Sequence, residues 1–235
     1  MEMPRASLLV VPIALFVIGA IGASVAHAAS LGGLSVASLW VWSAEADIDL
    51  DLPPPEPEFA ACDDFSGGSG PLDGRVTPCG ATWSVASGNW SLGNDILRST
   101  GRAGLATLPA GSSDMTVSVD VIDGHANNRR GGVVVAGSDT TRLVVLIEGS
   151  GGLRLQFVDG NSTTSLEYVN IPTAAVPRLS VTRSGTVVTV RVDGEVHISH
   201  MLTAAQSGLL TGTQAGLTKL QGPPAEFDRF EVTTP

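Results

Sequence analysis

The amino-acid sequence predicts an all-β fold, a two-sheet antiparallel jelly-roll β-sandwich, and three observations carry this prediction. From Thr82 to Thr233, apolar and polar residues alternate with the period of two that marks half-buried strands. Turn residues interrupt this pattern about every eight to twelve positions, a spacing typical of a sandwich or barrel. No stretch shows a convincing helical period. About twelve to fourteen strands are expected, and because one open sheet of that size would curl or split, we expect two packed sheets.

Individual strands are predicted from one-sided burial. In Met115 to Val121, the four apolar side chains point to one face, while Thr116, Ser118 and Asp120 point to the other. The same alternation recurs in Leu153 to Phe157, Leu179 to Thr182 and Val188 to Val192. Two segments, Gly132 to Ala136 and Leu143 to Ile147, are apolar on both parities, so we expect them in mid-sheet, covered on both sides.

Short turn dipeptides predict antiparallel connections between these strands. They are Gly151-Gly152, Asp159-Gly160, Ser184-Gly185 and Asp193-Gly194, which supply the positive φ that a tight hairpin needs. We interpret Ser87-Gly88 as a further turn, flanked by Trp83 and Trp90, which we expect in the core. The segment suited to a short helix is Leu202 to Leu210.

The N-terminal segment predicts export. Ser7 to Ala26 contains no charged residue and leads to Ala26-His27-Ala28, with small residues at the positions that signal peptidase reads. We interpret residues 1–28 as a secretory signal peptide; an uncleaved membrane anchor is the alternative, because about 20 apolar residues can span a bilayer. The predicted location is therefore secreted or cell-surface, by the general secretory route.

Residues 29–61 are predicted to connect the export segment to a sandwich domain at residues 62–235. Glu45 to Glu58 holds six carboxylates, four prolines and no basic residue. This composition favours an extended, self-repelling spacer. The spacer is a stalk that holds the domain away from a surface, an acidic segment that attracts calcium, or an ordinary solvated linker.

The composition limits which classes of molecule are expected to bind the protein. Thirteen basic against 23 acidic residues give a net charge of −10, which disfavours nucleic acid and anionic lipid as partners. Membrane contact is expected only through residues 7–26, if they are not cleaved. The two cysteines, Cys62 and Cys79, follow the export segment, so we expect a disulfide that stabilises the fold by about 3 kcal/mol.

Several short motifs resemble successive strands of the concanavalin A-like lectin/glucanase superfamily, notably its LamG-like jelly-roll domains in secreted bacterial proteins. The motifs are Asp63-Asp64-Phe65, Trp83-Ser84-Val85, Gly88-Asn89-Trp90, Ala106-Thr107-Leu108-Pro109, Ser118-Val119-Asp120-Val121, Gly131-Gly132-Val133-Val134, Gly152-Leu153-Arg154-Leu155, Arg191-Val192-Asp193-Gly194 and Phe227-Asp228-Arg229-Phe230-Glu231-Val232. The resemblance covers about Asp63 to Thr233. It implies two antiparallel sheets with adjacent first and last strands, a concave face able to hold glycans, and often a structural Ca²⁺.

Candidate binding residues cluster after the strand that ends at Val121. Asp120 and Asp123 lie beside His125, Asn127, Asn128, Arg129 and Arg130, and Tyr168 is the best candidate for a partly exposed ring. These residues form either a rim that hydrogen-bonds a glycan or an ordinary solvated loop. Asp64 and Asp228 would converge on Ca²⁺ if the first and last strands pair; otherwise they are exposed edge charges.

The sequence argues against the best-known chemistry of the superfamily. Its β-glucan hydrolases resemble one another in a Glu-x-Asp-x-x-Glu strand motif, which this sequence lacks, as it lacks serine-hydrolase, phosphate-loop and zinc-protease motifs. No cofactor is required. We therefore expect a non-catalytic module that weakly binds a carbohydrate or matrix component. The alternatives are a structural envelope or adhesion component, and a glycoside hydrolase or lyase with an unrecognised catalytic pair.

Overall fold

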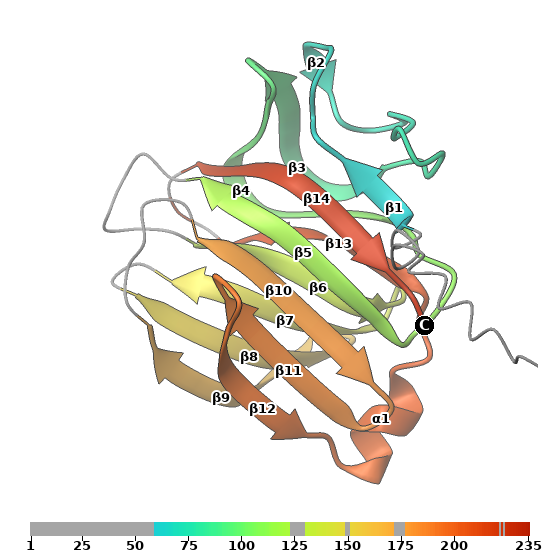
Figure 1. Ribbon diagram of the computed structural model, residues 1–235, viewed down its shortest axis with the longest axis vertical. Coiled ribbons are helices and arrows are strands. Elements are labelled where there is room, and N and C mark those ends of the chain that lie inside the picture. The colour runs from blue at the N-terminus through green and yellow to red at the C-terminus, as the bar shows by residue number, and fades with distance from the viewer. Residues whose placement is uncertain (1–58, 123–129, 149–150, 172–176, 221, 223) are drawn as a thin grey trace, which may run out of the picture. The chain divides into compact units, whose positions relative to one another are not determined.

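The computed structural model describes residues 59–122, 130–148, 151–171, 177–220, 222 and 224–235, which form fourteen strands and one short helix. The strands make two antiparallel layers (Figure 1). We call the layer nearer the viewer the front sheet. It contains, in spatial order, β12 (Glu195–Met201), β11 (Val187–Val192), β10 (Arg178–Ser184), β5 (Met115–Ile122) and β14 (Ala225–Thr233).

The layer behind it is the back sheet. It contains, in spatial order, β9 (Ser162–Asn170), β8 (Gly152–Asp159), β7 (Thr141–Glu148), β6 (Arg130–Gly137) and β13 (Gln214–Lys219). All of these neighbours pair antiparallel. The predicted all-β jelly-roll sandwich is therefore confirmed.

Strand β4 (Ile96–Pro109) belongs to both layers. Its first residues pair with β14 in the front sheet, and Gly104 to Pro109 pair with β13 in the back sheet. Its hairpin partner β3 (Ser84–Gly93) bends at the same level, where a Cβ on Gly88 would lie 2.6 Å from the Cα of Gly104. Gly88 has φ +84° and Gly101 has φ +84°, a region that glycine enters without steric cost.

The interpretation of Ser87-Gly88 as a turn was wrong. These residues lie inside β3, between two register shifts at which the strand bulges as it bends from one layer to the other. A glycine with positive φ serves a bulge as well as it serves a turn, so the local pattern did not separate the two cases.

The first and last strands are adjacent. β1 (Phe59–Asp63) pairs antiparallel with the second half of β14, with Phe59 opposite Thr233 and Asp63 opposite Phe230. The short β2 (Gly70–Pro71) pairs with β3. This arrangement agrees with what the resemblance to concanavalin A-like domains implies.

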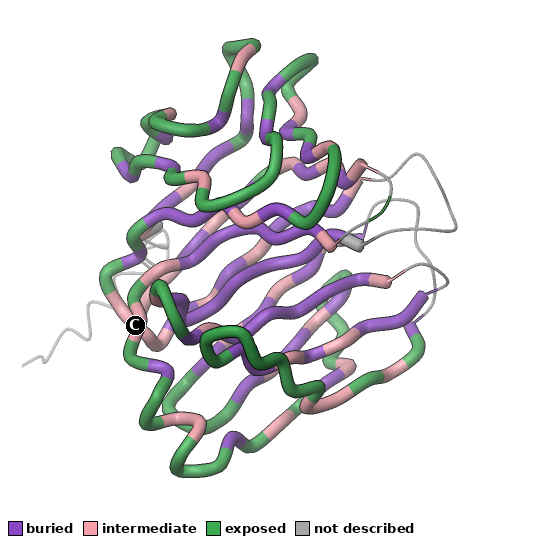
Figure 2. Tube along the Cα trace, turned by 180° about the vertical axis from the view of Figure 1, so that it is seen from behind, coloured by how far each residue is buried: buried purple, intermediate pink, exposed green. Residues whose placement is uncertain are grey.

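The core lies between the two layers, and Figure 2 shows its buried positions running along the strands. Met115, Val117, Val119 and Val121 are at most 1% exposed, which confirms the predicted inward face of β5. The inward faces predicted for β8, β10 and β11 are confirmed in the same way: Leu153, Leu155, Phe157, Leu179, Val181, Val188, Val190 and Val192 are buried. Trp83 and Trp90 are also in the core, as expected.

The two segments that are apolar on both parities lie in β6 and β7, which form the middle of the back sheet, as predicted. Val133 and Val135 of β6 and Val145 of β7 point into the core. Val134, Val144 and Leu146 belong instead to a second apolar cluster with Val158 on the outer face of the back sheet, with Leu105 and Leu220 packed against it. The outer parity of β6 and β7 is therefore the floor of a surface hollow.

The predicted short helix is α1 (Ala204–Leu209), at the lower end of Figure 1. It begins with a capping box in which Thr203 and Gln206 bond each other's backbone N–H groups. Leu202 and Leu210 on either side are buried, and Thr141 at the start of β7 donates to the carbonyl of Leu209. The helix thus closes one end of the core.

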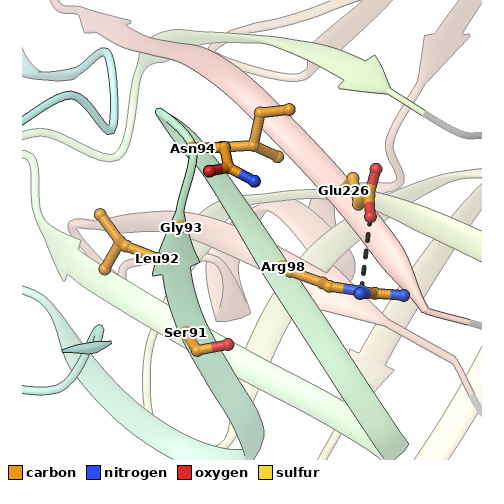
Figure 3. A pocket seen from close by; sticks show the side chains of 7 residues that line it. Ser91, Leu92, Gly93, Asn94, Arg98 and Glu226 are labelled. Atoms are coloured by element: carbon orange, nitrogen blue, oxygen red, sulfur yellow. Dashed lines mark ion pairs between the residues drawn. The ribbon is translucent and has the colours of Figure 1, made fainter. Parts of the chain in front are cut away.

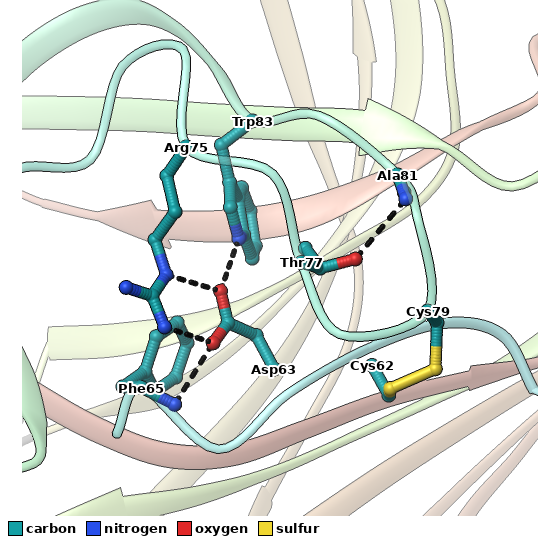
Figure 4. The surroundings of a disulfide bond; sticks show 8 residues. All are labelled: Cys62, Asp63, Phe65, Arg75, Thr77, Cys79, Ala81 and Trp83. Atoms are coloured by element: carbon teal, nitrogen blue, oxygen red, sulfur yellow. Dashed lines mark hydrogen bonds and ion pairs between the residues drawn. A yellow bond between two sulfur atoms is a disulfide. The ribbon is translucent and has the colours of Figure 1, made fainter. Parts of the chain in front are cut away.

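The predicted disulfide joins Cys62 of β1 to Cys79, with the Cα atoms 5.4 Å apart (Figure 4). Beside it, Asp63 is fully buried and accepts four hydrogen bonds. They come from Phe65 N at 2.9 Å, Trp83 Nε1 at 2.8 Å, and Arg75 Nε and Nη2 at 3.1 Å each. This cluster fixes the start of the sandwich to its core.

The predicted export segment and acidic spacer lie outside the described residues. Within the ranges that the structure describes, no helix is long and apolar enough to cross a membrane.

Candidate functional site

The outer face of the back sheet carries two adjoining cavities, of about 210 Å³ and about 170 Å³. Leu105 and Arg142 line both. The larger cavity is also lined by Ser87, Ala103, Gly104, Val144, Gln156, Val158, Thr163, Thr218, Lys219 and Leu220. The smaller is also lined by Ser84, Ala86, Thr107, Val134, Gly137, Ser138, Asp139 and Gln214. We call the two together the back-sheet groove.

Strand register assembles the groove. Val144 lies opposite Val134 on one side and Gln156 on the other, and Val158 lies between Arg142 and Thr163. Because residues two apart share a face of a sheet, these outward positions form a continuous surface across four strands. Its floor is apolar, and its rim offers amide, hydroxyl and guanidinium groups.

Arg142 is the cation of the groove. It is half-buried, and burial lowers the pKa of its guanidinium, which still remains charged at physiological pH. Among the described residues, no carboxylate forms an ion pair with Arg142, and the guanidinium makes no hydrogen bond. Its donors are therefore available to a ligand.

Lys219, which also lines the larger cavity, is a second cation of the groove. Its side chain is buried, and its Nζ donates to the carbonyls of Gly101, Leu220 and Gly222 at 2.9, 3.0 and 3.1 Å. Burial lowers the pKa of this ammonium. Because all three donors are engaged, Lys219 acts on the groove through its charge and holds the bend of β4 against the end of β13.

Tyr168 stands on the outer face of β9 with 47% of its surface exposed, as the sequence predicted. The Arg154 guanidinium lies 5.1 Å from the ring centroid, and the same guanidinium forms a two-point ion pair with Glu148 at 2.8 and 2.9 Å. The ring, the arginine and the carboxylate form a second polar area on the back sheet, at the end where β6 begins.

Asp120 lies on the outer face of the front sheet. It is 3% exposed, and its two oxygens accept from Arg178 Nη1 at 2.9 Å and Arg229 Nε at 2.6 Å. Arg178 also pairs with Glu231. Both carboxylate oxygens are thus engaged in a surface network that ties β5 to β10 and β14.

The structure therefore places Asp120 and Tyr168 on different sheets. Of the residues between them in the predicted binding cluster, Asp123, His125, Asn127, Asn128 and Arg129 lie outside the described residues. Only the backbone of Arg130 is described; it pairs with Glu148, at the end of the back sheet nearest Tyr168.

The two aspartates predicted to attract calcium lie just beyond the last paired rung of β1 and β14, where Asp63 is opposite Phe230. Asp64 is exposed, and its Oδ1 accepts from the N–H and hydroxyl of Ser66, which lowers the pKa of its carboxyl. Asp228 accepts from the N–H of Arg229. Across the described ranges, no group of three or more His, Cys, Asp or Glu side chains is arranged to hold a metal ion.

A larger cavity, of about 340 Å³, lies at the tip of the β3–β4 hairpin (Figure 3). Its lining includes Arg98 and Glu226, which form an ion pair with a 3.4 Å separation. Because its cation is already neutralised and mostly solvated, this cavity offers a ligand less than the back-sheet groove does.

Sequence reasoning missed the groove residues. Arg142 directly precedes the apolar run Leu143 to Ile147, and Gln156 lies on the outward parity of β8, two residues before Val158. A polar residue that shares a parity with Val144 and Val158 marks a face that is neither core nor ordinary surface. That signal was present, but it becomes a site only once the strands are in register.

The chain matches no protein-family model and no curated protein. It is similar to the carbohydrate-binding module CBM66 from Bacillus subtilis, with TM-score 0.55, 13% identity, and coverage of 65% of this chain and 95% of that one. It is also similar to SCLam, a non-specific endo-β-1,3(4)-glucanase of family GH16 (TM-score 0.55, 10% identity, 77% and 92% coverage). LamAcat from Zobellia galactanivorans gives TM-score 0.50, 10% identity, and 75% and 97% coverage. At these identities the likeness shows the fold, a concanavalin A-like jelly-roll sandwich.

Proposed function

We propose that the sandwich is a secreted or surface-displayed, non-catalytic carbohydrate-binding module, and that its saccharide lies along the back-sheet groove. The observation that carries the proposal is the pair of adjoining cavities with one apolar floor and a hydrogen-bonding rim. The similarity of the fold to a carbohydrate-binding module supports it.

The groove chemistry suits a sugar. The apolar C–H face of a pyranose ring can lie on Val144 and Val158, while Gln156 and Thr163 both donate to and accept from its hydroxyls. Each cavity is smaller than the about 300–1,000 Å³ of drug-sized sites. Binding is therefore expected to be weak per sugar and to extend over several sugars of a chain.

The carboxylates of this face support a binding rather than a hydrolytic role. Glycoside hydrolysis in most families needs two carboxyl groups that flank the scissile bond. Among the described strand positions on the outer face of the back sheet, Glu148 is the one carboxylate, and Arg154 engages both its oxygens. Asp139, which lines the smaller cavity, precedes the opposite end of β7, so it and Glu148 do not flank one bond.

The connection from β5 to β6 is a proposed additional contact. Arg130 begins β6 at the end of the back sheet where the exposed Tyr168 ring lies, and the predicted binding residues from Asp123 to Arg129 directly precede it in the sequence. A polysaccharide longer than the groove would extend toward this end.

A blocking substitution tests the proposal. Thr163→Trp places a large ring over the larger cavity. Thr164→Trp makes the same change at the neighbouring position, which is also exposed but lies on the opposite side of β9. Affinity electrophoresis in gels containing laminarin, dextran, polygalacturonate or dextran sulfate measures binding. We expect at least one polymer to retard the wild-type protein and the Thr164→Trp variant, but not Thr163→Trp.

Two results would overturn the proposal. One is that none of the polymers retards the wild-type protein. The other is that Thr163→Trp is retarded as strongly as Thr164→Trp.

A further inference from the structure

We propose that the saccharide bound in the back-sheet groove is anionic, a sugar that carries a carboxylate or sulfate group, and that Arg142 binds this group. The inference rests on the proposed function and adds the chemical class of the ligand.

The charge of the groove is opposite to the charge of the chain. The protein has a net charge of −10, yet the larger cavity is lined by Arg142 and Lys219 and by no Asp or Glu among the described residues. In the smaller cavity, Asp139 is the one described carboxylate, and it forms no ion pair with Arg142 there. The groove is thus a local positive site on an acidic protein.

Arg142 also differs from most other arginines of the described chain. Six arginines have carboxylate partners: Arg75 with Asp63, Arg98 with Glu226, Arg154 with Glu148, Arg178 and Arg229 with Asp120, and Arg183 with Asp114. Arg102 and Arg191 have none among the described residues, but they line neither cavity. Among the described arginines, Arg142 alone combines a position in the back-sheet groove with free donors.

Physical chemistry favours an anion at this place. A guanidinium that is partly removed from water loses hydration, and an anionic ligand restores its hydrogen bonds and charge balance. The planar fork of arginine matches two oxygens of a carboxylate or sulfate. Lys219 strengthens the attraction through its charge, because its own donors are engaged by three carbonyls.

The discriminating experiment uses two matched ligand pairs that differ in charge. Polygalacturonate is compared with its methyl-esterified form, and dextran sulfate with dextran, by isothermal titration calorimetry and affinity electrophoresis. We expect the wild-type protein to bind the charged member of at least one pair about tenfold or more tightly than its neutral member. The pair that shows the preference identifies carboxylate or sulfate as the recognised group.

Variants locate the effect. Arg142→Gln should abolish most of the preference for the charged polymer, because binding to the charged member falls far more than binding to the neutral member. Arg142→Lys should keep part of the preference. Arg154→Gln removes an arginine on the same face that Glu148 already neutralises, and should change the preference less than about twofold. Thermal melts of each variant verify that it is folded.

The outcomes separate this inference from the proposed function. Equal affinity for both members of both pairs overturns the inference, even if Thr163→Trp still abolishes binding and so upholds the groove. A preference for charge that persists unchanged in folded Arg142→Gln also overturns it. If no polymer binds, the proposed function fails and the inference fails with it.

Discussion

The buried carboxylate Asp63 offers the sharpest test of what stabilises this sandwich. Its Oδ1 accepts from Phe65 N and Arg75 Nη2, and its Oδ2 from Arg75 Nε and Trp83 Nε1 (Figure 4). Asp63→Asn keeps the shape but replaces one acceptor oxygen with a donor. Whichever way the amide turns, two of the four donors lose their acceptor and the ion pair with Arg75 is lost.

The expected loss in the free energy of unfolding follows from the two lost hydrogen bonds. A hydrogen bond to a charged group contributes about 1.5–3 kcal/mol. The Arg75 side chain is 21% exposed and regains some hydration, so the lower value applies and two lost bonds amount to about 3 kcal/mol. For a domain of this size, that loss corresponds to a fall in Tm of about 6–12 °C.

Urea unfolding followed by tryptophan fluorescence measures the change in the free energy of unfolding. Asp64→Asn is the matched control, since Asp64 is the next residue, is exposed, and among the described residues accepts only from Ser66. We expect a loss under about 0.5 kcal/mol. A loss below about 1 kcal/mol for Asp63→Asn, with an unchanged urea dependence, would refute the assigned role of the buried network.

Three further predictions concern the frame of the sandwich. Gly88→Ala should cost about 3 kcal/mol, because it combines positive φ with a Cβ clash at the β4 bend, whereas Gly74→Ala, with φ +76° and open space, should cost about 1 kcal/mol in the same urea assay. Reduction of the disulfide, or Cys79→Ser, should each lower the free energy of unfolding by about 3 kcal/mol, and dithiothreitol should have no effect on the Cys79→Ser variant. The Ser66 hydrogen bonds lower the pKa of the Asp64 carboxyl, so the ionised carboxylate stabilises the fold above the ordinary pKa of 3.8, and this contribution is lost as the pH falls through the folded-state pKa. Asp64→Asn should therefore reduce the difference in Tm between pH 7 and pH 3. An unchanged difference in Tm would contradict this prediction.

Features decided by neighbouring residues could be predicted from the sequence. The alternation of apolar and polar residues placed Val117 and Val119 in the core. The presence of only two cysteines predicted the disulfide between them. The segment from Leu202 to Leu210 contains the helix, as predicted. Each depends on local periodicity, on turn chemistry, or on there being only two thiols to pair.

Features decided by distant pairing could not be predicted. Asp120 was correctly placed on the polar face of its strand, but the arginines that engage it are 58 and 109 residues away. Similarly, Arg142 becomes a groove residue only because β13 and the second half of β4 complete the back sheet beside β6. The alternation of apolar and polar residues shows which side of a strand faces solvent. It does not show which strands are its neighbours in the sheet.

The pairing of β1 with β14 determines how the sandwich responds to mechanical load. Phe59 and Thr233 are opposite each other at one end of two antiparallel strands, so tension applied between them would open the pair like a zipper, one rung after another. The opening reaches Cys62 after only a few residues, and there the covalent link to Cys79 holds that strand to the body of the fold. We therefore expect the sandwich to withstand attachment at one of these two strand ends better than tension applied between both of them.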